Sequence, residues 1–215
     1  HEVTLKTDSG SLLQMLFTSG IITANRLNAS AGGALNFNHA NRVVELGDYA
    51  SGSGVAGFTN DGGFALAGNV SGDEVVLQSL NGGITQSAGS IDAGSIHASA
   101  AGSILLNRAN QVAAAGSVRL VSTGGDVTFG ALGGFALDFG TAAGIFDVTS
   151  DTGSIGQSGL ITANRLNVRA GGDIALTGDN AVAGIGTLSA AGDIAFTAAG
   201  DLLLTDAIDA NGAVT

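Results

Sequence analysis

The acidic residues are the first side chains in this sequence that could carry out chemistry. Asp follows Gly directly before a short apolar segment at Asp126, Asp173, Asp193 and Asp201. Two carboxylates about 5 to 9.5 Å apart can hydrolyse a glycosidic bond. If neighbouring strands stack ~4.8 Å apart, Asp173 and Asp193 could lie that close, with Asp126 at the same corner in the middle of the chain. Each of them occupies a recurrent Gly-Asp position with no Lys, Arg or His placed to complete a site, so we interpret them as turn residues. We predict no catalytic residue and no enzyme activity.

The same residue types suggest metal binding only weakly. Gly171-Gly172-Asp173 followed by Gly178-Asp179 partly resembles calcium-binding β-roll repeats, but the tandem nine-residue pattern of those repeats is absent. His1, His39 and His97 fall in unrelated positions, and the chain has no Cys. Phosphate-loop and dinucleotide patterns are also absent. We therefore predict no metal site and no cofactor.

Two arginines recur in identical surroundings. Arg26 and Arg165 each follow an Asn in the heptapeptide ITANRLN. A guanidinium there could donate to a sugar or an acidic partner. The simpler interpretation is that each arginine forms an ion pair with an acidic residue on the neighbouring coil. We therefore assign no residue to ligand binding.

The heptapeptide itself shows how the chain is organised. It occupies Ile22–Asn28 and Ile161–Asn167, 139 positions apart, and the residues after each copy match at the same offset. A diverged copy begins at Ile91, halfway between them. The chain is thus three macro-repeats of about 70 residues, 22–90, 91–160 and 161–215, which indicate a solenoid from 22 to 215. Residues 1–21 form an irregular segment ahead of it.

Short apolar-x-apolar triplets recur roughly every 7 to 10 residues between Gly, Asn, Asp and Ser turns. Such alternation predicts short strands with one buried face. Equivalent residues recur after about 20 to 24 positions, as in Ile174 to Ile194, so we expect coils of that length, roughly three to a macro-repeat. No stretch keeps a helical pattern for long, because Gly interrupts it. We therefore predict an all-β fold, a parallel β-helix of nine or ten coils. The triplets are Leu35-x-Phe37, Val75-x-Leu77, Ile104-x-Leu106, Val118-x-Leu120, Val127-x-Phe129, Phe135-x-Leu137, Ile174-x-Leu176, Ile194-x-Phe196 and Leu202-x-Leu204.

Three asparagines occupy one repeated position. Asn41, Asn110 and Asn180 each lie two residues before a Val. Asn hydrogen-bonds backbone groups in turns, so we expect these side chains to cap turns or to stack.

Two segments depart from the repeat. The stretch 47–63, with Asp48, Tyr49 and Asp61, has few inward apolar residues, and we expect it to be a surface excursion where binding could reside. The second is an apolar cluster without counterpart in the later copies, which is either an insertion on the flank or a strand of unassigned register: Leu12, Leu13, Met15, Leu16 and Phe17.

Composition excludes several classes of protein. The formal net charge is -11, which repels phosphate backbones and makes nucleic acid an unsuitable partner. Gly numbers 36 without a Gly-X-Y period, which excludes collagen. Cys is absent, so no disulfide can form, but a long solenoid buries a continuous core without one.

One segment of the chain resembles the repeats of filamentous-haemagglutinin-type exoproteins. It covers residues 153–196, GSIGQSGLITANRLNVRAGGDIALTGDNAVAGIGTLSAAGDIAF, and has a diverged relative in 83–120. Such exoproteins are adhesins of Gram-negative two-partner secretion systems, and the same repeats form stalks of contact-dependent inhibition toxins. The resemblance covers most of the chain from Ile22 onward. It implies a right-handed parallel β-helix, export through an outer-membrane transporter, and an extracellular location at the bacterial surface. It also implies that the chain is an interior segment of a longer protein.

These observations predict a structural or adhesive β-helical shaft, with surface receptors or glycans as possible partners. A self-assembling extracellular fibre is the alternative, because uncapped ends of a β-helix expose strand edges. A polysaccharide-active enzyme is the third hypothesis, since β-helices also carry such activities.

Overall fold

The structure, a computed structural model, describes residues 1–15, 20–114 and 116–215 of the chain. This described part forms twenty strands and no helix, so no helix in it could cross a membrane. The strands are β1 (Glu2–Thr7), β2 (Leu12–Leu13), β3 (Thr23–Ala31), β4 (Leu35–Ser51), β5 (Val55–Asn60), β6 (Phe64–Leu66), β7 (Val70–Ser79), β8 (Ile84–Gln86), β9 (Ile91–Ala100), β10 (Ile104–Val112), β11 (Ser117–Ser122), β12 (Val127–Ala131), β13 (Phe135–Thr141), β14 (Ile145–Ser150), β15 (Ile155–Gln157), β16 (Ile161–Ala170), β17 (Ile174–Ala190), β18 (Ile194–Ala198), β19 (Leu203–Leu204) and β20 (Ile208–Ala210).

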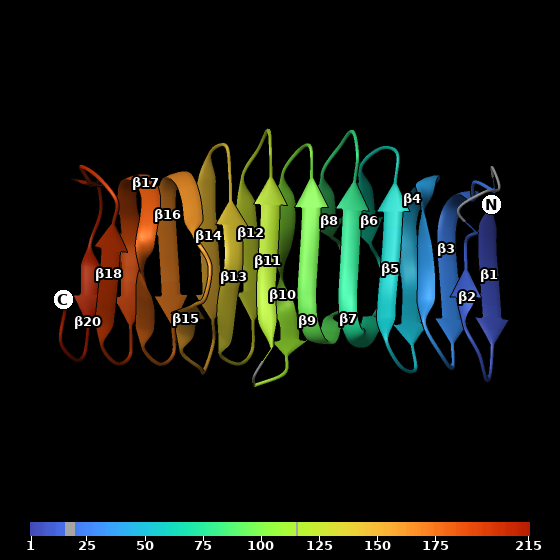
Figure 1. The fold of residues 1–215 in the computed structure, drawn as a ribbon, viewed down its shortest axis with the longest axis horizontal. Coiled ribbons are helices and arrows are strands. Elements are labelled where there is room, and N and C mark those ends of the chain that lie inside the picture. The colour runs from blue at the N-terminus through green and yellow to red at the C-terminus, as the bar shows by residue number, and fades with distance from the viewer. Residues whose placement is uncertain (16–19, 115) are drawn as a thin grey trace.

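The strands stack in parallel into about 10 coils, with the two termini at opposite ends of an elongated molecule (Figure 1). Registered partners such as Leu27, Leu46 and Leu66 follow one another at intervals of one coil. The predicted all-β parallel β-helix is therefore confirmed. At ~4.8 Å a coil, the stack is roughly 45 Å long.

The strand pairings run in two series along the stack. One series joins β3, β4, β6, β8, β10, β12, β14 and β16. The other joins β4, β5, β7, β9, β11, β13 and β15. The 17-residue strands β4 and β17 bend around a corner, so that each takes part in both series.

This arrangement corrects the expected number of coils in a macro-repeat. The first and third copies of the heptapeptide lie in β3 and β16, which belong to the first series, but the middle copy lies in β9, which belongs to the second. The first series leads from β3 to β16 in seven steps of one coil each, so the two identical copies are seven coils apart. The middle copy lies halfway between these two copies, so one macro-repeat covers half of the seven coils. A macro-repeat therefore contains about three and a half coils and not three.

The core is a set of columns of stacked apolar side chains inside the coils. One column runs through Ile84, Ile104, Val127, Phe146, Leu166 and Ile185, each at most 1% exposed. Alternate residues of each strand point into this core, as the triplets predicted. Burying a side chain of this size contributes roughly 1.5 to 3 kcal/mol, and the contribution repeats in every coil.

The prediction of a surface excursion at 47–63 is wrong. These residues continue β4 and form β5, and Tyr49 is fully buried. Its ring makes edge contacts with Phe37 and Phe58, at 6.0 and 5.9 Å between centroids. The segment looked polar because Asp48 and Gly47 precede Tyr49, but the aspartate faces outward while the tyrosine takes the inward position.

The segment 1–21, expected to be irregular, carries two strands of the stack. β1 pairs with β3, from Glu2 opposite Arg26 to Thr7 opposite Ala31, and β2 pairs with β4. Of the apolar cluster, Leu12 packs against the core whereas Leu13 and Met15 are exposed. Leu16 and Phe17 lie outside the described residues.

Candidate functional site

The three aspartates considered for catalysis all bind backbone at corners of the stack, but not at one shared corner as expected. Asp173 and Asp193 share a corner, where Ile174 pairs with Ile155 of the second series, whereas Asp126 precedes β12 of the first series. One carboxylate oxygen of each accepts a hydrogen bond from the next coil: Asp126 from Ile145 N at 2.8 Å, Asp173 from Asp193 N at 2.9 Å, and Asp193 from Ala213 N at 2.7 Å. Asp173 and Asp193 therefore lie on adjacent coils, as the sequence suggested. The interpretation of these three as turn residues is confirmed, because each satisfies an N–H that the corner leaves outside the sheet ladder.

Another corner has the same kind of hydrogen bond, made by other residues. Asn28 Oδ1 accepts from Asp48 N at 3.1 Å, Asp48 Oδ1 accepts from Asn69 N at 2.9 Å, and Asn69 Oδ1 accepts from Ser90 N at 3.1 Å. Asp48, expected on a binding loop, is thus a link in a side-chain ladder across four coils.

The two repeated arginines, Arg26 and Arg165, make contacts with residues of other coils. Arg26 Nη1 lies 3.5 Å from Glu45 Oε2 on the next coil, and Arg26 Nη2 donates to Ala67 O at 3.2 Å, 41 residues on. Arg165 Nη2 pairs with Asp206, also 41 residues on. Both arginines therefore span two coils, and the ion-pair interpretation is confirmed. The Arg165 Nε atom is buried without a hydrogen-bond partner.

The predicted turn asparagines have partners that sequence reasoning missed. Asn110 Oδ1 accepts from Gln86 Nε2 at 2.8 Å and from Ile91 N at 2.9 Å, and its Nδ2 donates to Leu106 O and Gly130 O. Gln14 and Gln157 bind Asn41 and Asn180 in the same way, at 2.7 and 2.5 Å. Gln14, Gln86 and Gln157 recur at nearly the offset of the macro-repeat, so that offset was a signal that could have identified all three.

The histidines do not form a metal centre. Among the residues that the structure describes, no three His, Asp or Glu side chains lie close enough together to hold an ion. His1 and His39 contact backbone oxygens of Thr23 and Gly20. His97 Nδ1 lies 3.1 Å from Glu74 Oε1.

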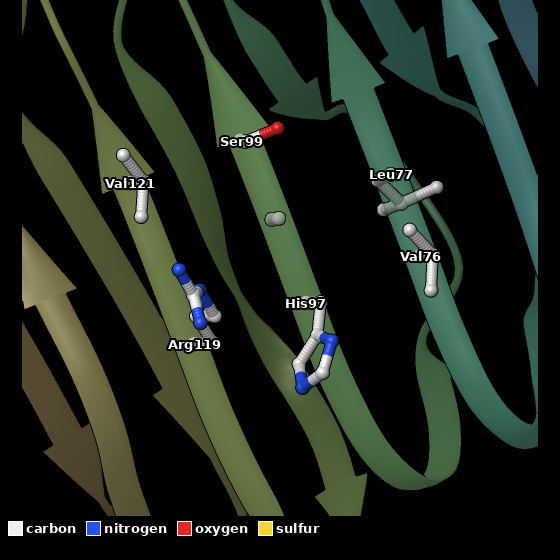
Figure 2. Close-up of a pocket in the computed structure, with 7 residues that line it drawn as sticks. Val76, Leu77, His97, Ser99, Arg119 and Val121 are labelled. Atoms are coloured by element: carbon white, nitrogen blue, oxygen red, sulfur yellow. The ribbon is translucent and has the colours of Figure 1, made fainter. Parts of the chain in front are cut away.

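His97 borders a surface hollow of about 320 Å³ over β7, β9 and β11. Figure 2 shows His97 and Arg119 side by side on neighbouring strands, with Val76, Ser99 and Val121 around them. Val76, His97 and Arg119 are registered partners on successive strands. The sequence interpretation missed this cluster because residues a coil apart become neighbours only once the register is known.

The chain has no match among the protein-family models, the curated proteins or the solved structures with which it was compared.

Proposed function

We propose that this chain is a structural and adhesive shaft segment of a large secreted bacterial surface protein. The observation that carries the proposal is the continuous parallel stack, in which one core runs through about 10 coils between termini at opposite ends. Such a stack separates whatever is attached to its two ends by a fixed distance. The similarity of the repeats to haemagglutinin-type exoproteins supports the same role.

Three features of the chain suit export through an outer-membrane transporter. Cys is absent, so no disulfide has to form or break during passage. Each coil packs its core on its neighbours, so folding can proceed coil by coil as the chain emerges. The strongly acidic composition keeps the folded exterior soluble. The outer-membrane transporter is thus the first partner that we propose, and the extracellular surface is the location.

Export and adhesion can be tested together. The chain is inserted between the secretion domain of a two-partner-secretion protein and an epitope tag, with the same fusion lacking the chain as control. We expect antibody to label the tag on intact cells in both cases, and cells that display the chain to adhere more strongly to host-cell or bacterial surfaces. Retention of the fusion inside the cell would contradict the export role, and adhesion equal to the control would restrict the proposal to a spacer.

A self-assembling fibre is a second candidate, because a parallel stack built coil on coil can continue from one molecule to the next. Electron microscopy over a range of concentrations would distinguish the two: filaments support the fibre, and single short rods support the shaft.

A further inference from the structure

A row of four outward-facing side chains crosses adjacent strands of the second series. Val76, His97, Arg119 and Phe139 are successive registered partners on β7, β9, β11 and β13. Their chain neighbours on the inner side, such as Val118 and Leu120 beside Arg119, are fully buried. Val76, His97 and Arg119 therefore line the hollow on the outer face (Figure 2), and Phe139 follows next to Arg119.

Arg119 differs from the other arginines in its contacts. Arg26, Arg42, Arg165 and Arg169 each pair with a carboxylate, and Arg108 donates to backbone oxygens. Within residues 1–15, 20–114 and 116–215, no carboxylate oxygen lies within 4.0 Å of the Arg119 guanidinium. In that part of the structure no protein group accepts a hydrogen bond from Arg119, even though the chain is strongly acidic, with a formal net charge of -11.

Phe139 orients this guanidinium. The Arg119 Cζ lies 5.1 Å from the centroid of the Phe139 ring, at the distance of a cation–π contact. Contact of a guanidinium with an aromatic ring leaves N–H edges available for an acceptor elsewhere. A carboxylate can receive two parallel hydrogen bonds from such an edge, which a point-like anion cannot do.

The rest of the hollow combines apolar and polar groups. Val121 presents methyl groups two residues along β11 from Arg119, and Ser99 presents a hydroxyl on the neighbouring strand, while Val76 lies on the far side of His97. The His97 Nδ1 lies 3.1 Å from Glu74 Oε1, so the other ring nitrogen, Nε2, is the one left to bond a ligand hydroxyl, which can donate or accept. A ligand that fits carries a carboxylate, a face of C–H groups and hydroxyls.

We propose that this hollow binds a sugar acid, with its carboxylate on Arg119, its hydroxyls on His97 and Ser99, and the C–H face of its ring against Val121. The volume of about 320 Å³ is at the small end for ligand sites, which suits a single sugar residue. The site is independent of the shaft proposal, because it lies on the side of the stack and not at its ends.

Ligand-observed nuclear magnetic resonance on the intact chain tests the proposal with three probes. Glucuronate has the carboxylate and the hydroxyls, glucose lacks the carboxylate, and isobutyrate lacks the hydroxyls. We expect glucuronate to bind in the millimolar range and at least about tenfold more tightly than either of the others. Its binding should weaken as salt is added, because the guanidinium is exposed.

Variants then assign the site. Arg119→Gln should weaken glucuronate binding about tenfold, and Arg119→Lys, which keeps the charge but not the planar pair of donors, by less. The matched control is Arg42→Gln, since Arg42 is an exposed arginine that already pairs with Asp61 at 3.6 Å. The proposal is overturned if glucuronate shows no saturable binding, if isobutyrate or glucose binds equally well, or if Arg42→Gln has the effect of Arg119→Gln while both variants keep the parent unfolding temperature.

Discussion

Single residues inside this solenoid show how polar groups are accommodated in a narrow core. Tyr49 is fully buried, and its hydroxyl donates to Gly57 O at 2.6 Å. Burial raises the pKa of Tyr49 well above its ordinary value of 10.0, and a backbone hydrogen bond at Phe37 opposes that shift. The neutral phenol is therefore the form that the folded state requires.

The first prediction follows from the sign of that shift. Because Tyr49 is the only tyrosine, the ultraviolet absorbance of phenolate reports on it alone. We expect the unfolded chain to titrate near pH 10 and the folded chain to resist titration there. The stabilisation from Tyr49 is fully present below about pH 10 and is lost as the pH rises from there through the higher pKa of the folded state. Phenolate absorbance that appears near pH 10 while the strand signal in circular dichroism persists would contradict the buried position.

Asn110 supplies the second prediction. Replacing it in Asn110→Leu leaves the N–H of Ile91 and the C=O groups of Leu106 and Gly130 without their side-chain partner. We expect the free energy of unfolding to fall by roughly 2 to 4 kcal/mol in urea titrations. The control Gln78→Leu, at an exposed position of β7, should change it by less than about 0.5 kcal/mol. Equal effects of the two substitutions would show that the buried carboxamide network does not stabilise the fold.

At the scale of elements, the corners of the stack restrict which residue types fit at equivalent positions of successive repeats. Gly47 and Gly186 occupy equivalent positions after the two identical heptapeptides, at bends of β4 and β17. A methyl group on Gly47 would collide with Asn28 Oδ1 and lie 2.8 Å from Arg26 Nε. On Gly186 it would meet Asn167 and Arg165 in the same way. The space that glycine leaves is thus filled by the Asn and Arg of the repeated heptapeptide one coil earlier.

The third prediction compares glycines in crowded and open surroundings. Gly47→Ala and Gly186→Ala should each lower the free energy of unfolding by about 1 to 3 kcal/mol, because Asn28 or Asn167 must leave its hydrogen bond to the next coil. Gly156→Ala in β15 meets nothing within 4 Å and should be neutral or stabilise by up to about 1 kcal/mol. Chemical denaturation measures all three. A cost at Gly156 equal to that at Gly47 would mean that backbone conformation, and not crowding, requires glycine at these positions.

For the whole molecule, stability and length should grow with the number of coils. Since each coil packs its core on its neighbours, an added macro-repeat brings its own core and one more interface. The fourth prediction is that duplicating residues 91–160 lengthens the molecule by about three and a half coils, or ~17 Å.

Spin labels at Asp8→Cys and Asp209→Cys can measure this length, because both positions are exposed and the chain has no other Cys. The distance distribution between the labels should be narrow and should shift to longer distances in the duplicated chain, by an amount that combines the added length with the half coil by which one label moves around the stack. A broad distribution, or one that the duplication leaves unchanged, would contradict a rigid stack.

The sequence by itself determined the fold class and the repeat. Alternating triplets such as Ile174-x-Leu176 form a local pattern that recurs at a regular interval. Stacked coils of short strands bury the apolar residues of this pattern in one continuous core. The same reasoning identified the turn roles of Asp173 and Asn110, because these depend on the backbone immediately around each residue.

Only the tertiary structure decided which residues become neighbours across coils. The inward position of Tyr49, the pairing of Gln86 with Asn110, and the juxtaposition of His97 with Arg119 all depend on register. Coil lengths vary because bulges and corner loops absorb extra residues, as between Leu106 and Asn110 in the pairing of β10 with β12. A shift of one residue exchanges the inner and outer faces of a strand, so contacts on the surface cannot be deduced from an average period.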